Sequence, residues 1–438
     1  MNAITQHEGP QLARAATPGV LLTAATAYGT LAAARSLDRA GIDVVMADPD
    51  WLAPGLWSRA VKHSLRCPDA STQPEAFVQW LLDFGARAPG TVLYATTDDV
   101  AWLMARNRER LARNFLMYQP PLAATTALLN KWQLSRACAA VGLETPRTWL
   151  PEDDTALRHV REDSAGPWVI KPQTQALFAS HQKGQLVRDG RQLEGAYHAF
   201  EAASSHALAM RQADPGISRP LVQAFCETAA DHIYNLSGFI DETGSLCVAR
   251  ASRKVLQWPY RLGIGLCFEA AEVQPELSAG VARLCRRVGH YGAFEVEFVE
   301  ASPKHWELID FNPRFYGELG FDVARGLDLP RLVYLAATGQ HAALQRAVEL
   351  MGLQPPREDQ AWCNRLQFEL VLGLRRVAGV LPPGEAERWR AWLWDHRRGL
   401  VDAVLDRRDW RPALVDGAMG VLARARHPRG TWRAAHEA

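Results

Sequence analysis

The residues best suited to metal and phosphate chemistry lie on two neighbouring segments joined by a short turn, and they are Glu295, Glu297, Asp310 and Asn312. Alternate residues of a β-strand share a face, so the two glutamates would share one face of the first strand. The aspartate and the asparagine would share one face of the second. A tight turn lays the strands side by side, which brings carboxylate and amide oxygens together. Such oxygens suit Mg²⁺, which usually also binds phosphate.

Arg314 stands two residues after this pattern and could bind a phosphoryl oxygen. Taken alone, these residues leave open a solvated hairpin with ordinary charges. The chain has 49 lysine and arginine residues but places lysine only at 62, 131, 171, 183, 254 and 304, a bias that carries no function by itself. Lysine was nevertheless kept at these positions where arginine is the usual cation, and the two are not equivalent at a compact phosphate site, where a point charge could be needed.

Composition excludes several classes of protein. The chain has 438 residues, which predicts two to four domains at roughly 100–200 residues each. Hydrophobic residues make up 48% and charged residues 22%, so a largely disordered chain is excluded. The net charge of +1 provides no overall basic field that would favour binding to nucleic acid. The sequence contains no run of about 18 apolar residues, so no membrane-spanning helix is predicted.

The seven cysteines show no C-x-x-C spacing, so neither a disulfide framework nor a zinc site is indicated. A cytoplasmic location is the simple expectation. Residues 1–17 lack the pattern of a secretory signal and are expected to form a flexible leader.

The elements that must position these residues begin with an α/β domain over 18–125. An apolar run from Gly19, a helical pattern ending at Gly41 and a second apolar run form a β-α-β unit, which predicts a parallel sheet. A later strand ends in Asp98 and Asp99, at the carboxyl edge where such sheets bind ligands.

From 126 to 340 the pattern changes to α+β. One strand ends at Lys171 and is followed by a polar loop, and two hairpins turn at 242–245 and 301–304. Residues 341–438 read as mainly helical, with interleaved tryptophan and arginine. That tail could form a lid, a homodimer surface or a membrane-surface contact, or simply a helical cap whose tryptophans pack on the core.

In the order and spacing of these pieces, the chain resembles the ATP-grasp superfamily over about 20–340. The similar branch includes biotin carboxylase, carbamoyl-phosphate synthetase and many carboxylate–amine ligases. The resemblance implies a Rossmann-like pre-ATP-grasp domain, then an ATP-grasp domain whose clamping subdomain, about 165–225, is mobile. A mainly helical C-terminal extension follows.

The resemblance also implies roles for individual residues. The ATP phosphates would be bound by Lys131, Lys171 and Lys183. Adenine would contact Gln223, Ala224 and Cys226, and the ribose would lie near Asp231. The metal ligands would be Glu297, Asp310 and Asn312. The catalytic cations would be Arg314, Arg253 and Lys254.

Three positions depart from the family pattern. Asp310 replaces the commoner glutamate, and the loop over 172–184 lacks the usual glycines. Glu318 follows Gly317 where relatives usually have serine or threonine. A carboxylate there could hold the ammonium group of an amine, or it could be a surface charge.

The function implied is that of a ligase that uses ATP with Mg²⁺, or Mn²⁺ in its place, to join a small carboxylic acid and an amine. An acyl phosphate would form, and ADP and phosphate would be released. The substrate pocket would include Tyr28, Asp98, Asp99, Tyr316 and Glu318. A carboxylase that uses bicarbonate and a nucleotide-binding module without catalysis are the alternatives.

Overall fold

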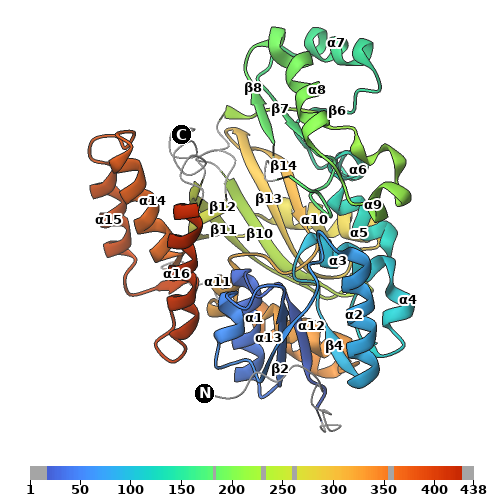
Figure 1. The fold of residues 1–438 in the computed structure, drawn as a ribbon, viewed down its shortest axis with the longest axis vertical. Helices are drawn as coiled ribbons and strands as arrows, with labels where there is room; N and C mark the ends of the chain where they lie inside the picture. The colour runs from blue at the N-terminus through green and yellow to red at the C-terminus, as the bar shows by residue number, and fades with distance from the viewer. Residues whose placement is uncertain (1–16, 181–183, 228–232, 259–263, 354–359, 427–438) are drawn as a thin grey trace.

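The computed structural model describes residues 17–180, 184–227, 233–258, 264–353 and 360–426. A large sheet crosses the middle of the molecule. A small sheet lies above it, a parallel sheet lies below it, and the last helices stand to one side (Figure 1).

The first domain is the predicted parallel sheet, with strand order β3-β2-β1-β4-β5. The strands are β1 (Val20–Thr23), β2 (Val44–Asp48), β3 (His63–Arg66), β4 (Thr91–Leu93) and β5 (Phe115–Leu116). The helices of this domain are α1 (Tyr28–Arg39), α2 (Pro74–Arg87), α3 (Asp98–Arg106) and α4 (Arg108–Leu111). Thr97 caps α3 by accepting a hydrogen bond from the Val100 amide, so α3 begins at the carboxyl end of β4.

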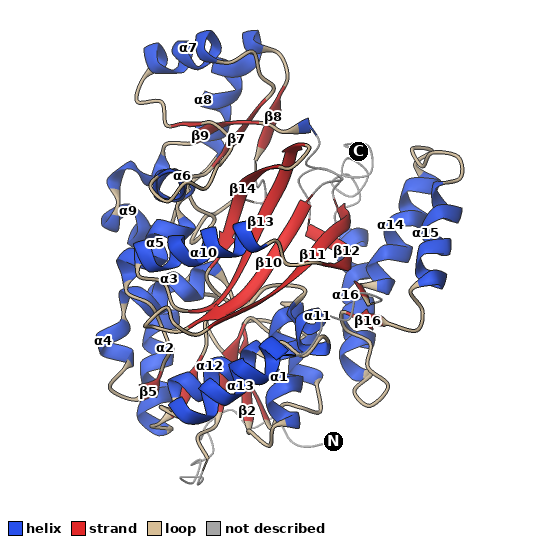
Figure 2. Ribbon diagram, turned by 180° about the vertical axis from the view of Figure 1, so that it is seen from behind, coloured by secondary structure: helices blue, strands red, loops and turns tan. Residues whose placement is uncertain are grey.

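A small antiparallel sheet of order β6-β9-β7-β8 forms the upper lobe. Its strands are β6 (Thr148–Trp149), β7 (Trp168–Lys171), β8 (Gln185–Val187) and β9 (Leu221–Ala224). Helices α7 (Asp154–Asp163) and α8 (Leu193–Ala203) pack on this sheet through a core that includes Val160, Trp168 and Phe200. Figure 2 shows α6 (Lys131–Ala139) below this lobe and α9 (Leu208–Ala213) at the edge of the molecule, where Ala209 and Met210 join a core cluster of the first domain.

The large sheet has the order β14-β13-β10-β11-β12-β15-β16. Its strands are β10 (Ile233–Ile240), β11 (Cys247–Trp258), β12 (Ile264–Ala271), β13 (Gly292–Ser302), β14 (His305–Asn312), β15 (Ala361–Cys363) and β16 (Leu400–Asp402). Both predicted hairpins, β10–β11 and β13–β14, are confirmed. Helices α5 (Leu122–Leu129) and α10 (Pro275–Val288) share a core with this sheet that includes Leu128, Leu284 and Phe298.

Helices α11 (Leu319–Ala324), α12 (Leu329–Ala337) and α13 (His341–Leu353) follow the large hairpin. Their buried residues, including Leu319, Leu332 and Leu344, join one core cluster with Val20 and Leu22 of β1. These three helices therefore pack on the first domain.

The rest of the C-terminal extension contains α14 (Arg365–Val377), α15 (Glu385–Asp395) and α16 (Arg411–Arg426). It is mainly helical as predicted, but β15 and β16 add two unpredicted strands to the large sheet. Strand β15 pairs antiparallel with β12, and β16 pairs parallel with β15. The extension is thus continuous with the central sheet.

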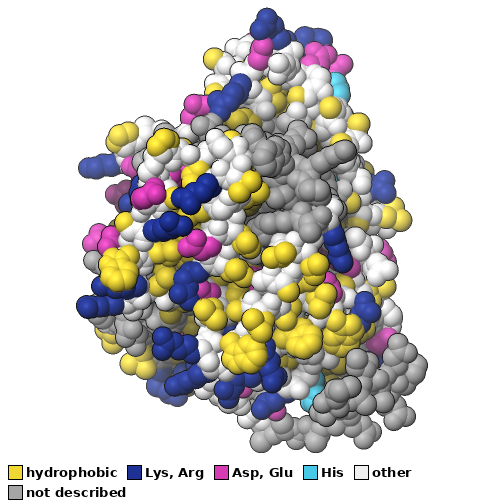
Figure 3. Space-filling view, turned by 60° about the vertical axis from the view of Figure 1, so that its left-hand side comes forward, with side chains coloured by type: hydrophobic (Ala, Val, Ile, Leu, Met, Phe, Trp, Pro, Cys, Tyr) yellow, Lys and Arg dark blue, Asp and Glu magenta, His cyan; other side chains and the backbone are white. Residues whose placement is uncertain are grey.

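The tryptophans of the extension divide between core and surface. Trp389 is buried, and Trp392 is partly buried with its ring nitrogen 2.5 Å from Glu269 Oε1. Trp394 and Trp410 are exposed, by 66% and 52%. Figure 3 shows apolar side chains gathered among basic ones on one face of the molecule. The expectation that the tryptophans of the extension pack on the core therefore holds for Trp389 and Trp392 but not for Trp394 and Trp410.

Among the described residues, no helix is both long enough and apolar enough to cross a bilayer.

Asp409 fastens the extension to the first domain. Its Oδ2 accepts hydrogen bonds from Arg35 Nε at 2.9 Å and from Ser58 Oγ at 2.6 Å, and its Oδ1 accepts one from the Arg59 amide at 2.9 Å. The Asp409 side chain is 5% exposed and that of Arg35 is 12% exposed. A single carboxylate thus satisfies three donors at this contact.

We expect Asp409→Ala to lower the free energy of unfolding by about 2–3 kcal/mol, because Arg35 Nε, the buried Ser58 hydroxyl and the Arg59 amide lose their shared acceptor. Urea unfolding followed by tryptophan fluorescence measures this change. The control is Asp43→Ala, which removes an exposed carboxylate 3.9 Å from Lys62 and should cost less than about 0.5 kcal/mol. Equal effects of the two variants would contradict the role assigned to Asp409.

Candidate active site

The β13–β14 hairpin brings together the residues that the alternation pattern predicted. In its register Glu295 pairs with Asn312 and Glu297 pairs with Asp310. All four line one cavity of about 360 Å³, as do lysines and an arginine from other elements. The hairpin is therefore one wall of a charged site and not a solvated face.

Two lysines neutralise carboxylates in this cavity. Lys131, the first residue of α6, places Nζ 2.5 Å from Asp310 Oδ1, and Lys254 of β11 places Nζ 2.6 Å from Glu297 Oε1. Asn130 caps α6 by accepting hydrogen bonds from the Trp132 and Gln133 amides, which fixes the position of Lys131.

Burial is the largest single influence on the pKa values of these groups, but the neighbouring charges together outweigh it. Burial favours the neutral lysines, yet Asp310 raises the pKa of Lys131 and Glu297 raises the pKa of Lys254. Burial also acts against the Asp310 carboxylate, but Lys131 and the more distant Lys171 and Arg314 lower its pKa to about 2. The side chain of Asp310 is still 39% exposed, toward the open cavity.

Lys171 ends β7 and donates to a neutral amide. Its Nζ lies 3.0 Å from Gln223 Oε1 on β9, and Gln223 Nε2 donates to Thr148 Oγ1 at 3.0 Å. Burial, reinforced by the positive charge of Lys131, lowers the pKa of Lys171 to about 8. A nearby anion would therefore stabilise the protonated form of Lys171 and raise its pKa.

Arg314 is held by groups from two domains. Its Nε donates to Asp98 Oδ1 at 2.7 Å, its Nη2 to Asn312 Oδ1 at 2.7 Å and its Nη1 to the Phe315 carbonyl at 2.8 Å. Asp98, predicted to lie in the substrate pocket, does line the cavity, but its observed contact is this ion pair. The first domain therefore fixes the arginine of the second.

Asn235 joins two buried carboxylates, and sequence reasoning missed it. Its Nδ2 donates to Glu295 Oε1 at 2.6 Å and to Glu318 Oε1 at 3.0 Å. Burial, with the charges of Glu318 and Glu297, raises the pKa of Glu295 well above its usual value. Burial also raises the pKa of Glu318 to about 7. This corner is short of positive charge and suits a cation.

The opposite end of the cavity is apolar. The segment after β9 contributes Ala224, Phe225 and Cys226, and its backbone is fixed because the Ala224 and Phe225 amides donate to the Arg147 and Pro167 carbonyls. Apolar side chains missed by sequence reasoning complete this end, and they are Pro146, Val169, Ile233, Val299 and Ile309. In the sequence these are isolated apolar residues on separate strands, and such a pattern cannot be distinguished from that of residues in a hydrophobic core.

A second hollow of about 270 Å³ opens at the carboxyl ends of β1 and β4. It shares Asp98, Arg314, Tyr316 and Gly317 with the first cavity. Gly29 permits this arrangement, since a Cβ at that position would lie 2.0 Å from the Tyr316 carbonyl oxygen.

The remaining predicted substrate residues lie at these two hollows. Tyr28 and Tyr316 line the first, and Tyr316 also donates from its hydroxyl to Asp322 Oδ2 at 2.5 Å. Asp99 lines the second and accepts a hydrogen bond from the Leu177 amide at 2.5 Å. Burial raises the pKa of Asp99 to about 6.

Arg253, predicted to be a catalytic cation, does not line the cavity. It neighbours Lys254 on β11, and adjacent residues of a strand point to opposite faces. Lys254 is buried in the site, whereas Arg253 is exposed on the other side. Arg325 also lies outside the cavity lining, since it is buried and bonds to Asp322 and the Ala251 carbonyl. Lys183 and Asp231 lie outside the described residues.

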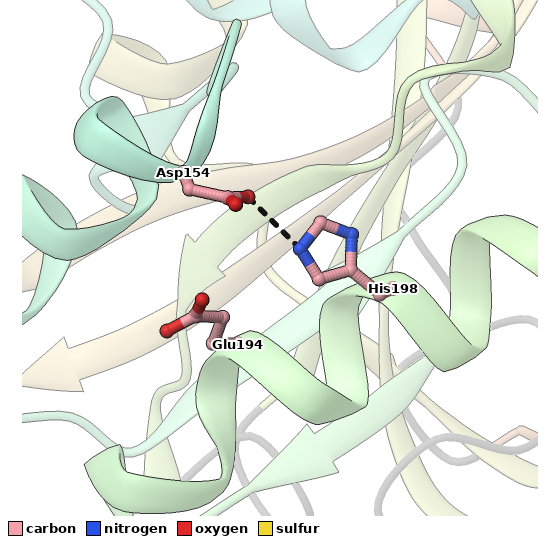
Figure 4. A group of neighbouring side chains, drawn as sticks. All are labelled: Asp154, Glu194 and His198. Atoms are coloured by element: carbon pink, nitrogen blue, oxygen red, sulfur yellow. Dashed lines mark hydrogen bonds and ion pairs between the residues drawn. The ribbon is translucent and has the colours of Figure 1, made fainter.

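Figure 4 shows a separate cluster of Asp154, Glu194 and His198 on α7 and α8. His198 Nε2 lies 2.9 Å from Asp154 Oδ1, and both side chains are about half exposed. An exposed ion pair between two surface helices accounts for this geometry.

Comparisons with solved structures reveal the same architecture. The biotin carboxylase domain of 2-oxoglutarate carboxylase from Hydrogenobacter thermophilus, solved with MgADP and bicarbonate, is similar with a TM-score of 0.58 and 14% identity, over 73% of this chain and 69% of that one. L-amino acid ligase from Bacillus licheniformis is similar with a TM-score of 0.56 and 14% identity, over 80% and 79%. N5-carboxyaminoimidazole synthetase from Staphylococcus aureus has a TM-score of 0.54 and 13% identity, over 74% and 78%.

No protein-family model matches the chain, and no curated protein sequence matches it. At these identities the likeness establishes the fold. The predicted ATP-grasp fold, with its preceding parallel-sheet domain and helical C-terminal part, is confirmed.

We expect ADP binding to take up a proton above pH 8. Free Lys171, with a pKa of about 8, is then mostly neutral, and an adjacent phosphate would restore its charge. The affinity for ADP should therefore fall by up to about tenfold per pH unit above pH 8. Calorimetry in buffers of different ionisation enthalpy measures the proton uptake.

Lys171→Arg should remove this pH dependence, because arginine stays charged. The matched control, Lys62→Arg, changes an exposed lysine and should keep it. Wild-type binding at pH 8.5 without proton uptake would contradict the role of Lys171.

Proposed function

We propose that this protein is an ATP-dependent carboxylate–amine ligase that forms an amide bond through an acyl phosphate and releases ADP and phosphate. The observation that carries the proposal is one cavity that combines Lys131, Lys171, Lys254 and Arg314 with paired carboxylates and an apolar end. The ATP-grasp fold it shares with known ligases supports the proposal.

The donor set fits Mg²⁺ and a triphosphate. Glu297, Asp310 and Asn312 would be the metal ligands, since all three offer hard oxygen atoms at one point of the hairpin. Two of them are now neutralised by Lys131 and Lys254. When bound, Mg²⁺ would supply positive charge that offsets the negative charge of the phosphates. Those lysines would then be available to phosphate oxygens.

The apolar end of the cavity suits adenine. Val169 and Ile309 would lie against the ring, and the backbone of Ala224 and Cys226 would meet its edge. Gln223 would contact the nucleotide beside Lys171, whose ammonium group donates a hydrogen bond to the Gln223 side chain. The nucleotide would thus run from the small sheet toward Lys254 and Arg314.

In the first step, a carboxylate oxygen of the acid attacks the γ-phosphorus. The bond from that phosphorus to the β–γ bridging oxygen breaks, and ADP leaves with the electron pair. Such a transfer depends on positioning and on charge neutralisation more than on a protein nucleophile. Arg314, which Asp98 and Asn312 hold in place, would bind the transferring group.

In the second step, the amine attacks the acyl carbon and the bond from that carbon to the phosphate oxygen breaks. The ammonium form loses one proton to solvent before the attack, and the nitrogen loses a second proton after it, which leaves with phosphate or passes to solvent. Before this step, Glu318 would bind the amine in its ammonium form, in the corner that it shares with Asn235 and Glu295. Tyr28, Tyr316 and Asp99 would bound the substrate space.

ADP release tests the function. We expect release to require a specific carboxylic acid and to rise when its amine partner is added. Release driven by bicarbonate alone would favour a carboxylase. Binding of Mg-ATP without turnover for any pair of substrates would favour a nucleotide-binding module instead.

We expect Glu297→Gln and Lys171→Ala each to lower ADP formation by at least about a thousandfold, because each removes a charge from phosphoryl transfer. Coupled-enzyme measurement of ADP follows the loss, and the Tm shows that the fold is intact. Glu307→Gln is the matched control, on the same hairpin but outside the cavity lining, and it should keep near wild-type activity. Wild-type turnover in either site variant would refute the roles assigned.

A further inference from the structure

One row of residues crosses the large sheet on the side of the cavity. Cross-strand pairing runs from Val299 of β13 to Ile233 of β10, Lys254 of β11, Phe268 of β12 and Trp362 of β15. Directly paired residues of adjacent strands share a face of the sheet. All five line the cavity. The cavity floor therefore runs from the apolar end, past Lys254, to an aromatic pair.

The aromatic pair is held rigidly. The rings of Phe268 and Trp362 lie edge to face, with centroids 5.5 Å apart, and each residue is 2% exposed. They share a core cluster with Leu31 and Phe321, and Tyr28 packs against it. Trp362 is the middle residue of β15, so the C-terminal extension supplies part of the cavity wall.

This end of the cavity lies within reach of the reacting atoms. Neighbouring strands are about 4.8 Å apart, so Phe268 lies one strand and Trp362 two strands beyond Lys254. The carboxylate of an acid must lie near the γ-phosphate, between Lys254 and Arg314. The body of the same acid can then extend across the sheet to the aromatic pair.

The corner suited to the amine lies in a different direction. Asn235 is two residues beyond Ile233 along β10, and it bonds Glu295 and Glu318. The acidic corner is thus displaced along the strands, whereas the aromatic pair is displaced across them. The two substrates would approach Arg314 from different sides.

We propose that Phe268 and Trp362 bind the side group of the carboxylic acid, so that the preferred acid carries an apolar, ring-sized group. This inference rests on the proposed function, and it names the acid class for that site. The C-terminal extension is then a determinant of specificity.

Hydroxylamine in place of the unknown amine allows a test with the full chain, because it traps an acyl phosphate as a hydroxamate. The acids are matched pairs, phenylacetate with acetate and L-phenylalanine with L-alanine. We expect the KM for at least one phenyl acid to be about tenfold or more below that of its small partner. Equal KM values within both pairs would overturn the inference.

Trp362→Leu should raise the KM for the phenyl acid by about tenfold and leave the KM for ATP unchanged. Trp362→Phe, which keeps a ring, should have a smaller effect. Trp389→Ala is the matched control, since Trp389 is buried in the same extension and does not line the cavity. If Trp389→Ala raised the KM as much, or if Trp362→Leu changed the KM for ATP equally, the effect would be structural and the inference would fail.

A binding measurement separates this inference from the proposed function. In the presence of Mg-ADP, the phenyl acid should raise the Tm of the wild type and not that of Trp362→Leu. If no acid yields hydroxamate or ADP, the proposed function fails, and a Trp362-dependent shift would still support the aromatic site. No shift in the wild type would overturn it.

Discussion

Two ion pairs held inside a cavity, with their lysines largely buried and their carboxylates partly exposed to it, are the constraint on which the rest of this structure depends. Lys131 with Asp310 and Lys254 with Glu297 join three separate elements, α6, β11 and the β13–β14 hairpin. Burying such pairs contributes little net stability, because desolvation offsets their attraction. Removing one partner, however, leaves a charge uncompensated. The arrangement therefore makes sense as a site that exchanges partners when a cation and a polyanion enter together.

The rest of the fold holds these charges in register. The tight pairing of β13 with β14 sets the carboxylates, and the capped start of α6 sets one lysine. The first domain contributes Asp98, which orients Arg314, and Gly29, which lets the backbone at Tyr316 approach closely. The parallel-sheet domain is thus part of the cavity wall even though it carries none of the lysines that line the cavity.

Features that depend on neighbouring residues, such as the faces of a strand and the position of its end, could be predicted from the sequence. Alternation along the hairpin gave the faces of Glu297 and Asp310, and a strand ending at Lys171 marked the small sheet. Alternation also argues against Arg253, since its neighbour Lys254 faces the cavity. What could not be read from the sequence depends on pairing between distant segments. Trp362 joins Phe268 through β15, a strand of three residues within a helical region, where periodicity carries no signal.

The scarcity of lysine acquires a physical explanation from the geometry. Lys131, Lys171 and Lys254 line the cavity, whereas Lys62 and Lys304 are exposed. Each lysine of the two ion pairs bonds one carboxylate oxygen through a compact ammonium group. Unlike a planar guanidinium, this group can turn to another acceptor without breaking several aligned hydrogen bonds. Arg314 instead bonds three acceptors at once and is fixed by them. A site that exchanged ligands at some cations and held another in place would need both residue types, and under the proposed function this would explain why an arginine-rich chain retains these lysines.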